Sequence, residues 1–314
     1  MHAVATPGRW IWRASGLITT AVLVLVGARL ITRAGQPEYA QPQATVIRTV
    51  TMLSPVTSLT VQSYGAPVQI TAGPGRRIQI TETIMYDSQA GGAPTVAHAV
   101  PTALSASAPA VPAVPSVPGG PLSGVPAVVQ SVSGGRLSVG DPACADSDCS
   151  VSFAVTVPSD VTATVSTDGG SVSVSGIAGA NLDSGGGPVR ARKIGGPLTV
   201  DTDGGSLQLD GLAGPLSADT DGGPLTAQGV TSATAAVSTG GGNAQLAFAA
   251  APDTVTVSTD GGDAQLAVPG GPYALTADSD GGPQPSVGIA TDTQAHRSIT
   301  VSSGGGALLI TPAP

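Results

Sequence analysis

The feature that most constrains this chain is a short unit that recurs along much of its length. The stretch "DTDGGSLQLDGLAGPL" begins at Asp201, and "DTDGGPLTAQGV" follows at Asp219. A fixed period is typical of arrays in which each unit packs on its neighbours. Eight copies align on the residue before the paired glycines, at intervals of 17 to 24 residues: Asp168, Gly185, Asp203, Asp221, Gly240, Asp260, Asp280 and Gly304.

Each copy predicts two short β-strands with one buried face. Leu198 and Val200 alternate with Thr199, and after the turn Leu207 and Leu209 alternate with Gln208. One copy has too few aliphatic side chains to fold alone, whereas parallel stacking covers every apolar face. The apolar positions recur in two columns: Val165, Leu182, Val200, Ala218, Val237, Val257, Ala277 and Val301, and then Val174, Ala191, Leu209, Ala227, Leu246, Leu266 and Ile310.

We therefore predict an all-β fold, a parallel β-solenoid (β-helix) with coils of about 18–20 residues, preceded by one N-terminal transmembrane helix. The alternative is an antiparallel meander or sandwich, because Asp-Gly is also a strong hairpin signal. In the solenoid, Arg192 is expected to lie over Asp210 of the next coil. The "DTDGG" stretch is interpreted as a corner, in which Gly-Gly supplies positive φ and the preceding Asp or Ser bonds back to the turn amides.

Composition agrees with thin β structure and argues against some partners. The chain has 44 Gly and 27 Pro but only two Phe and two Trp, which favours many turns over a thick core. The net charge is -8, and the cations Arg190, Arg192 and Lys193 form an isolated basic stretch. Because phosphate neutralisation needs clustered cations, we expect no nucleic acid partner.

The N-terminus predicts contact with a membrane. Residues 1–13 form a short tail, residues 14–32 a transmembrane anchor or signal segment, and residues 33–44 a Pro/Gln-rich stalk. A retained helix predicts a single-pass cell-membrane protein whose C-terminal domain lies outside the cytoplasm. Cleavage, with 26–28 as the small-residue site, predicts a secreted protein instead.

The rest of the chain divides into three parts. Residues 45–87 are expected to form the first β coils, because "LTVQSYGAPVQI" (59–70) superposes on "LTVDTDGGSLQL" (198–209). Residues 88–128 are rich in Pro and Ala and predict a disordered insertion. Residues 129–311 are assigned to the β-solenoid repeats, with an irregular coil near Ser286 because two prolines precede it.

Two cysteines, Cys144 and Cys149, lie five residues apart in a turn-rich stretch. An even pair close in sequence predicts a disulfide in an oxidising compartment, and two free surface thiols are the alternative. Two cysteines without nearby histidines do not complete a zinc site.

No catalytic motif or cofactor site is predicted. The sequence lacks a nucleophile elbow, a phosphate loop and a zinc-protease motif, and His98 and His296 lie in loop segments. The one metal alternative is calcium, because stacked D-x-D-G turns would bring carboxylates together; solvated turns without metal are the other reading. The calcium candidates are Asp201, Asp203, Asp219 and Asp221.

Two further stretches carry a family resemblance. "VTSLTVQSYGAPVQITAGPGRRIQIT" and "CSVSFAVTVPSDVTATVSTDGGSVSVSGIAG", followed by the T-D-G-G repeats, resemble the bacterial adhesin family of β-strand-repeat envelope proteins, a domain of unknown function. The resemblance covers 45–87 and 130–311. It implies surface adhesion and brings no binding residues with it; the 88–128 insertion and the proline-broken copy depart from it.

The function expected from these observations is non-catalytic. We expect a membrane-anchored extracytoplasmic module for adhesion or envelope scaffolding, with a cell-wall glycan or a surface protein as partner. The alternatives are a carbohydrate-active β-helix enzyme acting on an envelope or extracellular polysaccharide, and an envelope-stress sensor.

Overall fold

The computed structural model describes residues 43–53, 55–87, 125–145 and 149–313. The predicted anchor, and nearly all of the predicted stalk and insertion, lie outside these residues. Within them the regular structure is β-strand, apart from the short 3-10 turn η2 (Pro142–Cys144). Among the described residues, no helix has the length and apolar character needed to span a membrane.

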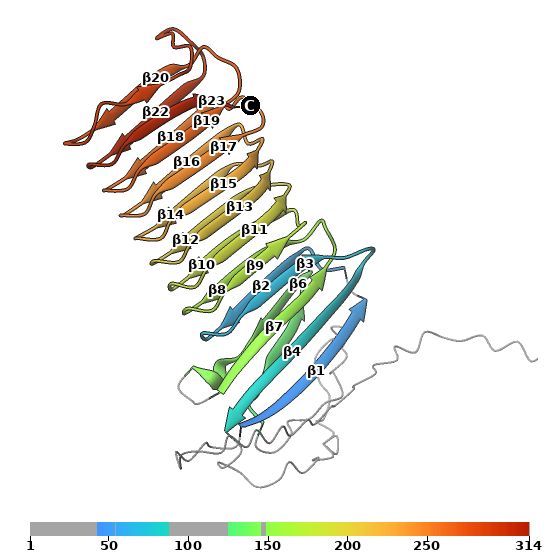
Figure 1. Cartoon of the computed structure of the whole chain (residues 1–314). Coiled ribbons are helices and arrows are strands. Elements are labelled where there is room, and N and C mark those ends of the chain that lie inside the picture. The colour runs from blue at the N-terminus through green and yellow to red at the C-terminus, as the bar shows by residue number, and fades with distance from the viewer. Residues whose placement is uncertain (1–42, 54, 88–124, 146–148, 314) are drawn as a thin grey trace, which may run out of the picture.

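The strands form two sheets, which we call sheet A and sheet B (Figure 1). Sheet A has the order β1 (Gln43–Leu53), β4 (Arg77–Asp87), β7 (Cys149–Val157), β3 (Val68–Ala72), β9 (Val172–Ser175), β11 (Val189–Ile194), β13 (Leu207–Leu212), β15 (Leu225–Val230), β17 (Ala244–Phe248), β19 (Ala264–Val268), β23 (Leu308–Pro312) and β21 (Ser286–Val287). Sheet B has the order β20 (Ala274–Ser279), β22 (Ser298–Ser303), β18 (Thr254–Thr259), β16 (Thr234–Thr239), β14 (Leu216–Thr220), β12 (Leu198–Thr202), β10 (Gly179–Ser184), β8 (Thr162–Thr167), β2 (Ser58–Ser63), β6 (Arg136–Gly140) and β5 (Val129–Ser133).

Successive strands of the repeats alternate between the sheets and pair in parallel with the equivalent strands of adjacent repeats. Leu182 lies between Val165 and Val200 in sheet B, and Ala191 lies between Val174 and Leu209 in sheet A. Both predicted apolar columns are therefore confirmed. The arrangement is all-β with parallel strands in two sheets, consistent with a β-solenoid, and the antiparallel alternative is wrong for the repeats.

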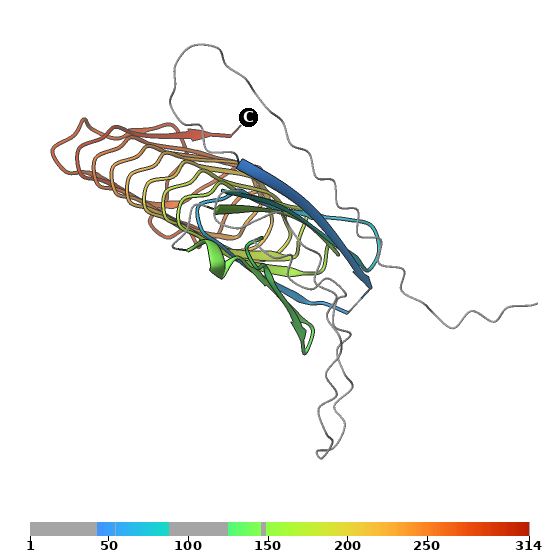
Figure 2. The same cartoon turned by 90° about the horizontal axis from the view of Figure 1, so that it is seen from below.

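The core is a thin aliphatic layer between the two sheets. Figure 2 shows the repeats as a succession of flattened loops. Along β12 and β13 buried and exposed side chains alternate, as the period of a strand requires. Larger buried side chains are few, with Phe153, Phe248 and Tyr273 among them. The small core explains why so few aromatic residues suffice.

The N-terminal end departs from the parallel pattern. β1 pairs with β4, and β4 with β7, in antiparallel register, and β5 forms an antiparallel pair with β6. Only β2 and β3 join the repeats in parallel, through β8 and β9. β1 and β4 carry no paired-glycine corner, so no turn of the repeat type shapes them into a coil.

The C-terminal end departs from sequence order. β22 lies between β18 and β20, so the last repeat is placed between the two repeats that precede it in sequence. The irregular coil falls where it was predicted, because β21 is only two residues long. Its register differs from the expected one, since Val287 and not Ser286 faces Ile310.

The corners are held by buried hydroxyl groups rather than by the aspartates. Thr202 Oγ1 accepts a hydrogen bond from the Gly205 amide at 3.1 Å, and Thr220 Oγ1 accepts one from Gly223 at 2.9 Å. Asp203 is exposed. The prediction that Asp or Ser holds the corner is correct only for the copies with serine. The hydroxyl residues buried at the corners are Ser63, Thr167, Ser184, Thr202, Thr220, Thr239, Thr259 and Ser303.

The second glycine of each pair is required for space, not for positive φ. A Cβ on Gly205 would lie 2.1 Å from the carbonyl oxygen of Gly187 in the preceding coil, whereas a Cβ on Gly204 would meet nothing within 4 Å. Gly204 and Gly222 lie outside the left-handed region, so the expected positive φ is wrong there. Equivalent close approaches to the preceding coil occur at Gly187, Gly223, Gly242, Gly262 and Gly306.

We predict that Gly205→Ala lowers the free energy of unfolding by about 2–4 kcal/mol, because the backbones of two coils must separate to admit the methyl group. Gly204→Ala is the matched control and should change stability by less than about 1 kcal/mol. Urea unfolding of both variants checks this. Equal destabilisation by the two substitutions would contradict a steric role for the second glycine.

Candidate functional site

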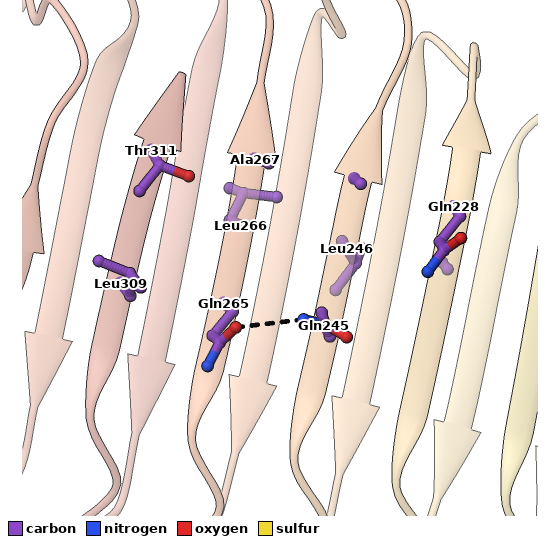
Figure 3. Close-up of a pocket in the computed structure, with 10 residues that line it drawn as sticks. Gln228, Gln245, Leu246, Gln265, Leu266, Ala267, Leu309 and Thr311 are labelled. Atoms are coloured by element: carbon purple, nitrogen blue, oxygen red, sulfur yellow. Dashed lines mark hydrogen bonds between the residues drawn. The ribbon is translucent and has the colours of Figure 1, made fainter. Parts of the chain in front are cut away.

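A shallow groove lies on the outer face of sheet A, over β15, β17, β19 and β23 (Figure 3). Its volume is about 230 Å³. Ala247 and Ala267 are neighbours in one outward column, and Thr311 follows them on β23. Because two methyl groups stand between the longer side chains of Gln228 and Thr311, the surface is hollowed there. The groove is lined by Ala227, Gln228, Gln245, Leu246, Ala247, Gln265, Leu266, Ala267, Leu309 and Thr311.

The polar rim of the groove is an amide ladder. Gln245 Nε2 donates a hydrogen bond to Gln265 Oε1 at 3.2 Å (Figure 3). The bond holds the two amides in line and leaves the donor group of Gln265 and the acceptor oxygen of Gln245 for other partners. No ionisable side chain lines this groove. It therefore offers neutral donors and acceptors beside apolar methyl groups.

A second hollow of about 250 Å³ adjoins the groove and shares Gln245 and Gln265 with it. Asn243 Oδ1 accepts a hydrogen bond from the Asp263 amide, and Asp263 Oδ1 accepts one from the Ala307 amide, both between coils. These bonds fix the side chains on the adjacent corner.

The predicted pair Arg192 and Asp210 is in register between β11 and β13. The predicted alignment is confirmed, but the described residues show no ion pair between these two side chains. The ladder contact in this region is made by Arg190, whose Nε donates to Gln208 Oε1 at 2.9 Å.

The calcium candidates lie on the outer face and corners of sheet B. Asp201 faces Asp219 on one side and Asp183 on the other. The pKa of Asp201 is raised, chiefly by partial desolvation and then by the negative charges of Asp219, Asp183, Asp203 and Asp221. The carboxylates thus repel one another in columns. Within the described residues, no group of three or more His, Cys, Asp or Glu side chains could hold a metal ion.

The two cysteines are joined. Cys144 at the end of η2 and Cys149 at the start of β7 form a disulfide. The bond ties the end of η2 to the first residue of β7, at the antiparallel end of sheet A. Cys144 is also part of the buried core.

Two buried carboxyl groups at the N-terminal end were missed at the sequence level. Glu82 on β4 is fully buried, lies 3.9 Å from Arg48 Nε, and accepts a hydrogen bond from Gln130 Nε2. Its Oε2 atom has no hydrogen-bond partner. Burial raises the pKa of Glu82, while Gln130 and Arg48 lower it. The signal was in the sequence, because Glu82 continues the inward series of Ile78 and Ile80.

The second buried carboxyl group is that of Asp141, just before η2. It is fully buried, and neither carboxyl oxygen has a hydrogen-bond partner. Burial raises the pKa of Asp141, and the backbone amides of Asp141 and Tyr64, which lie near the carboxyl group without reaching the geometry of a hydrogen bond, offset part of that rise.

Comparisons with known proteins give only remote likenesses. No protein-family model matches the chain, and no curated protein matches it. A candidate adhesin from Bacteroides fragilis has 12% identity and a TM-score of 0.35, covering 85% of this chain and 96% of its own. A candidate cell adhesion protein from Clostridium sporogenes has 8% identity and a TM-score of 0.23, covering 85% and 99%. At these TM-scores neither likeness carries an argument about this chain.

The buried Glu82 predicts a specific pH dependence. Because its pKa is raised in the folded state, ionisation opposes folding, and stability is lost as pH rises through the folded pKa. We expect Glu82→Gln to raise Tm at pH 8 and to leave it unchanged at pH 4, below the ordinary value of 4.5. Thermal unfolding at the two pH values checks this, with Asp160→Asn as an exposed control. A lower Tm at pH 8 would show that the Arg48 pair outweighs burial.

Proposed function

We propose that the chain is a non-catalytic, adhesin-like binding module of the bacterial envelope. The observation that carries the proposal is the groove on sheet A, where an amide ladder and alanine methyl groups form one preorganised, uncharged surface. Preorganised surfaces bind with little loss of side-chain freedom. The family resemblance of the repeats supports the same reading.

The ligand class that fits the groove is a neutral glycan. Uncharged amides supply both donors and acceptors, which hydroxyl groups need, and the methyl groups of Ala247 and Ala267 accept the apolar faces of a sugar ring. An ionised ligand would find no counter-charge in the groove. An envelope polysaccharide is therefore the favoured partner, ahead of a surface protein.

The proposed location is outside the cytoplasm, with residues 14–32 as the membrane anchor. That segment lies outside the described residues, so its support is the apolar sequence alone. The disulfide between Cys144 and Cys149 supports an oxidising compartment, since such bonds rarely persist in the cytosol.

The proposal is tested by filling the groove with larger side chains. We expect Ala247→Leu/Ala267→Leu to weaken binding of a fluorescent neutral cell-wall polysaccharide about tenfold or more, a loss of at least about 1.4 kcal/mol. The matched control is Ala236→Leu on the outer face of sheet B, which should bind like the wild type. Binding is measured on purified full-length protein in detergent and on intact cells.

Each arm has its own contradicting outcome. Binding that survives the filled groove, or no binding by the wild type, would overturn the groove as the site. Binding by purified protein but not by intact cells would overturn the external location. Shortening of the polysaccharide during incubation would overturn the non-catalytic reading and favour the enzyme.

A further inference from the structure

Lys193 has a backbone conformation that no other described non-glycine residue adopts. Its φ is 53°, within the left-handed region. The equivalent positions in adjacent coils are glycines in the same conformation: Gly176 at 77°, Gly211 at 66° and Gly229 at 61°. Every coil from β9 to β15 therefore bends through one column of left-handed residues, and one member of that column carries a side chain.

This placement is unfavourable for lysine and easily avoided. A side chain other than glycine is strained in the left-handed region because Cβ approaches the following carbonyl oxygen. The coils before and after avoid that strain, because their equivalent residues are glycines. Lys193 is also the only lysine of the chain. Strain retained at one position of a repeat, where its neighbours avoid it, indicates a function for the side chain.

The surroundings of Lys193 are cationic and open. Arg190 and Arg192 lie on the same strand, β11, and all three side chains are exposed. Among the described residues, none of the three forms an ion pair. Because Gly176 and Gly211 flank Lys193 across the coils, no side chain from those positions covers its ammonium group. We call Arg190, Arg192 and Lys193 the cationic cluster.

The neighbouring strands set the width of this cluster. On one side, Arg190 and Arg192 face Ser173 and Ser175 of β9, whose hydroxyl groups can donate hydrogen bonds to an anion. On the other side, Arg192 faces Asp210 of β13. The cationic strip is thus one strand wide, about 5 Å, with a carboxylate at its edge.

We propose that the cationic cluster binds a single chain of polyol phosphate, a linear polymer of phosphodiester groups, lying along β11. The expected absence of a nucleic acid partner is unchanged, because three cations on one strand do not form the wider basic surface that nucleic acid binding needs. Alternate residues of a strand are about 6.6 Å apart, so Arg190 and Arg192 present successive charges to a chain of regularly spaced phosphates. Arginine forks bind phosphate oxygens in pairs, and the ammonium of Lys193 adds a mobile point charge. In a chain of net charge -8, this local positive strip is the surface that complements such a partner.

A narrow polymer fits this surface better than an anionic bilayer. A plane laid on sheet A would bring Asp210 and Asp263 close to the same negative surface, and like charges would oppose the contact. A single strand of polymer along β11 lies over the cluster and beside the serines, and it approaches Asp210 only at its edge. The site is separate from the groove and does not depend on the function proposed for it.

The experiment measures binding of the full-length protein in detergent to poly(glycerol phosphate) by calorimetry at 50 mM NaCl. Arg190→Gln/Arg192→Gln/Lys193→Gln should weaken binding at least about tenfold, and 300 mM NaCl should weaken wild-type binding because the contacts are exposed. The control Arg76→Gln/Arg77→Gln/Arg136→Gln removes three exposed cations elsewhere and should bind like the wild type. Lys193→Gly introduces the residue that the adjacent coils have at this position. This variant should keep the fold, and its affinity for the polymer should fall about threefold or more.

The outcomes separate the possibilities. The absence of wild-type binding would overturn the proposal. An equal loss of affinity in the cluster and control variants would also overturn it, because net charge alone would then determine binding. Unchanged affinity of Lys193→Gly would remove the functional reason for the strain. Binding to vesicles with phosphatidylglycerol as strong as to the polymer would overturn the narrow-strand assignment.

Discussion

The close approach of backbone to backbone at the glycine corners is the constraint on which the rest of the structure depends. At most corners of the repeats, a Cβ at the second glycine of the pair would lie about 2.0–2.3 Å from a carbonyl oxygen in a neighbouring coil, as at Gly170, Gly205, Gly262 and Gly306. Glycine alone fits there. The buried hydroxyl three residues earlier, such as that of Thr202, then satisfies the glycine amide that the corner removes from water. Space and hydrogen bonding together set one distance and one register between coils.

That fixed register gives the outer faces their chemistry. When each residue lies over its equivalent, side chains of one kind form ladders, whether amides at Gln245 and Gln265 or carboxylates at Asp183, Asp201 and Asp219. The core keeps aliphatic side chains in the same two columns along the repeats, whereas the outward residues differ from coil to coil in charge and polarity. A groove arises where two outward residues are alanine, and a cationic strip arises where one coil replaces a glycine with Lys193. Both proposed binding surfaces thus lie where the outer side chains depart from the repeat.

The sequence allowed the repeats to be predicted in detail because the apolar residues of each copy keep a fixed distance in sequence from the paired glycines. The partners of Leu182 and Ala191, and the alignment of Arg192 with Asp210, follow from counting residues between glycine pairs. The hydrogen bonds that hold the corners could not be predicted by counting residues. The choice of Thr202 over Asp203 as the corner residue depends on which side chain turns inward, and both have oxygen acceptors.

The ends were less predictable for a different reason. A terminal coil has one neighbour, so packing does not force it into the repeat. β1 and β4 pair antiparallel, and the last repeat lies between the two repeats that precede it in sequence. The groove and the cationic cluster depend on side chains outside the repeat pattern. Periodicity places such residues on the surface but does not show which of them act together.

The most direct test of interlocked coils compares the urea unfolding of two deletion variants. One variant lacks a whole coil, and the other lacks half of a coil. Removal of 203–220 joins Thr202 to Asp221 and leaves every remaining strand in its own sheet. Removal of 203–211 shifts each later strand into the opposite sheet and places the hydroxyl–glycine corners out of line. Stacked coils predict a cooperative transition near that of the wild type for the first deletion and loss of the folded state for the second. Equal tolerance of both deletions would contradict a register set by the corners.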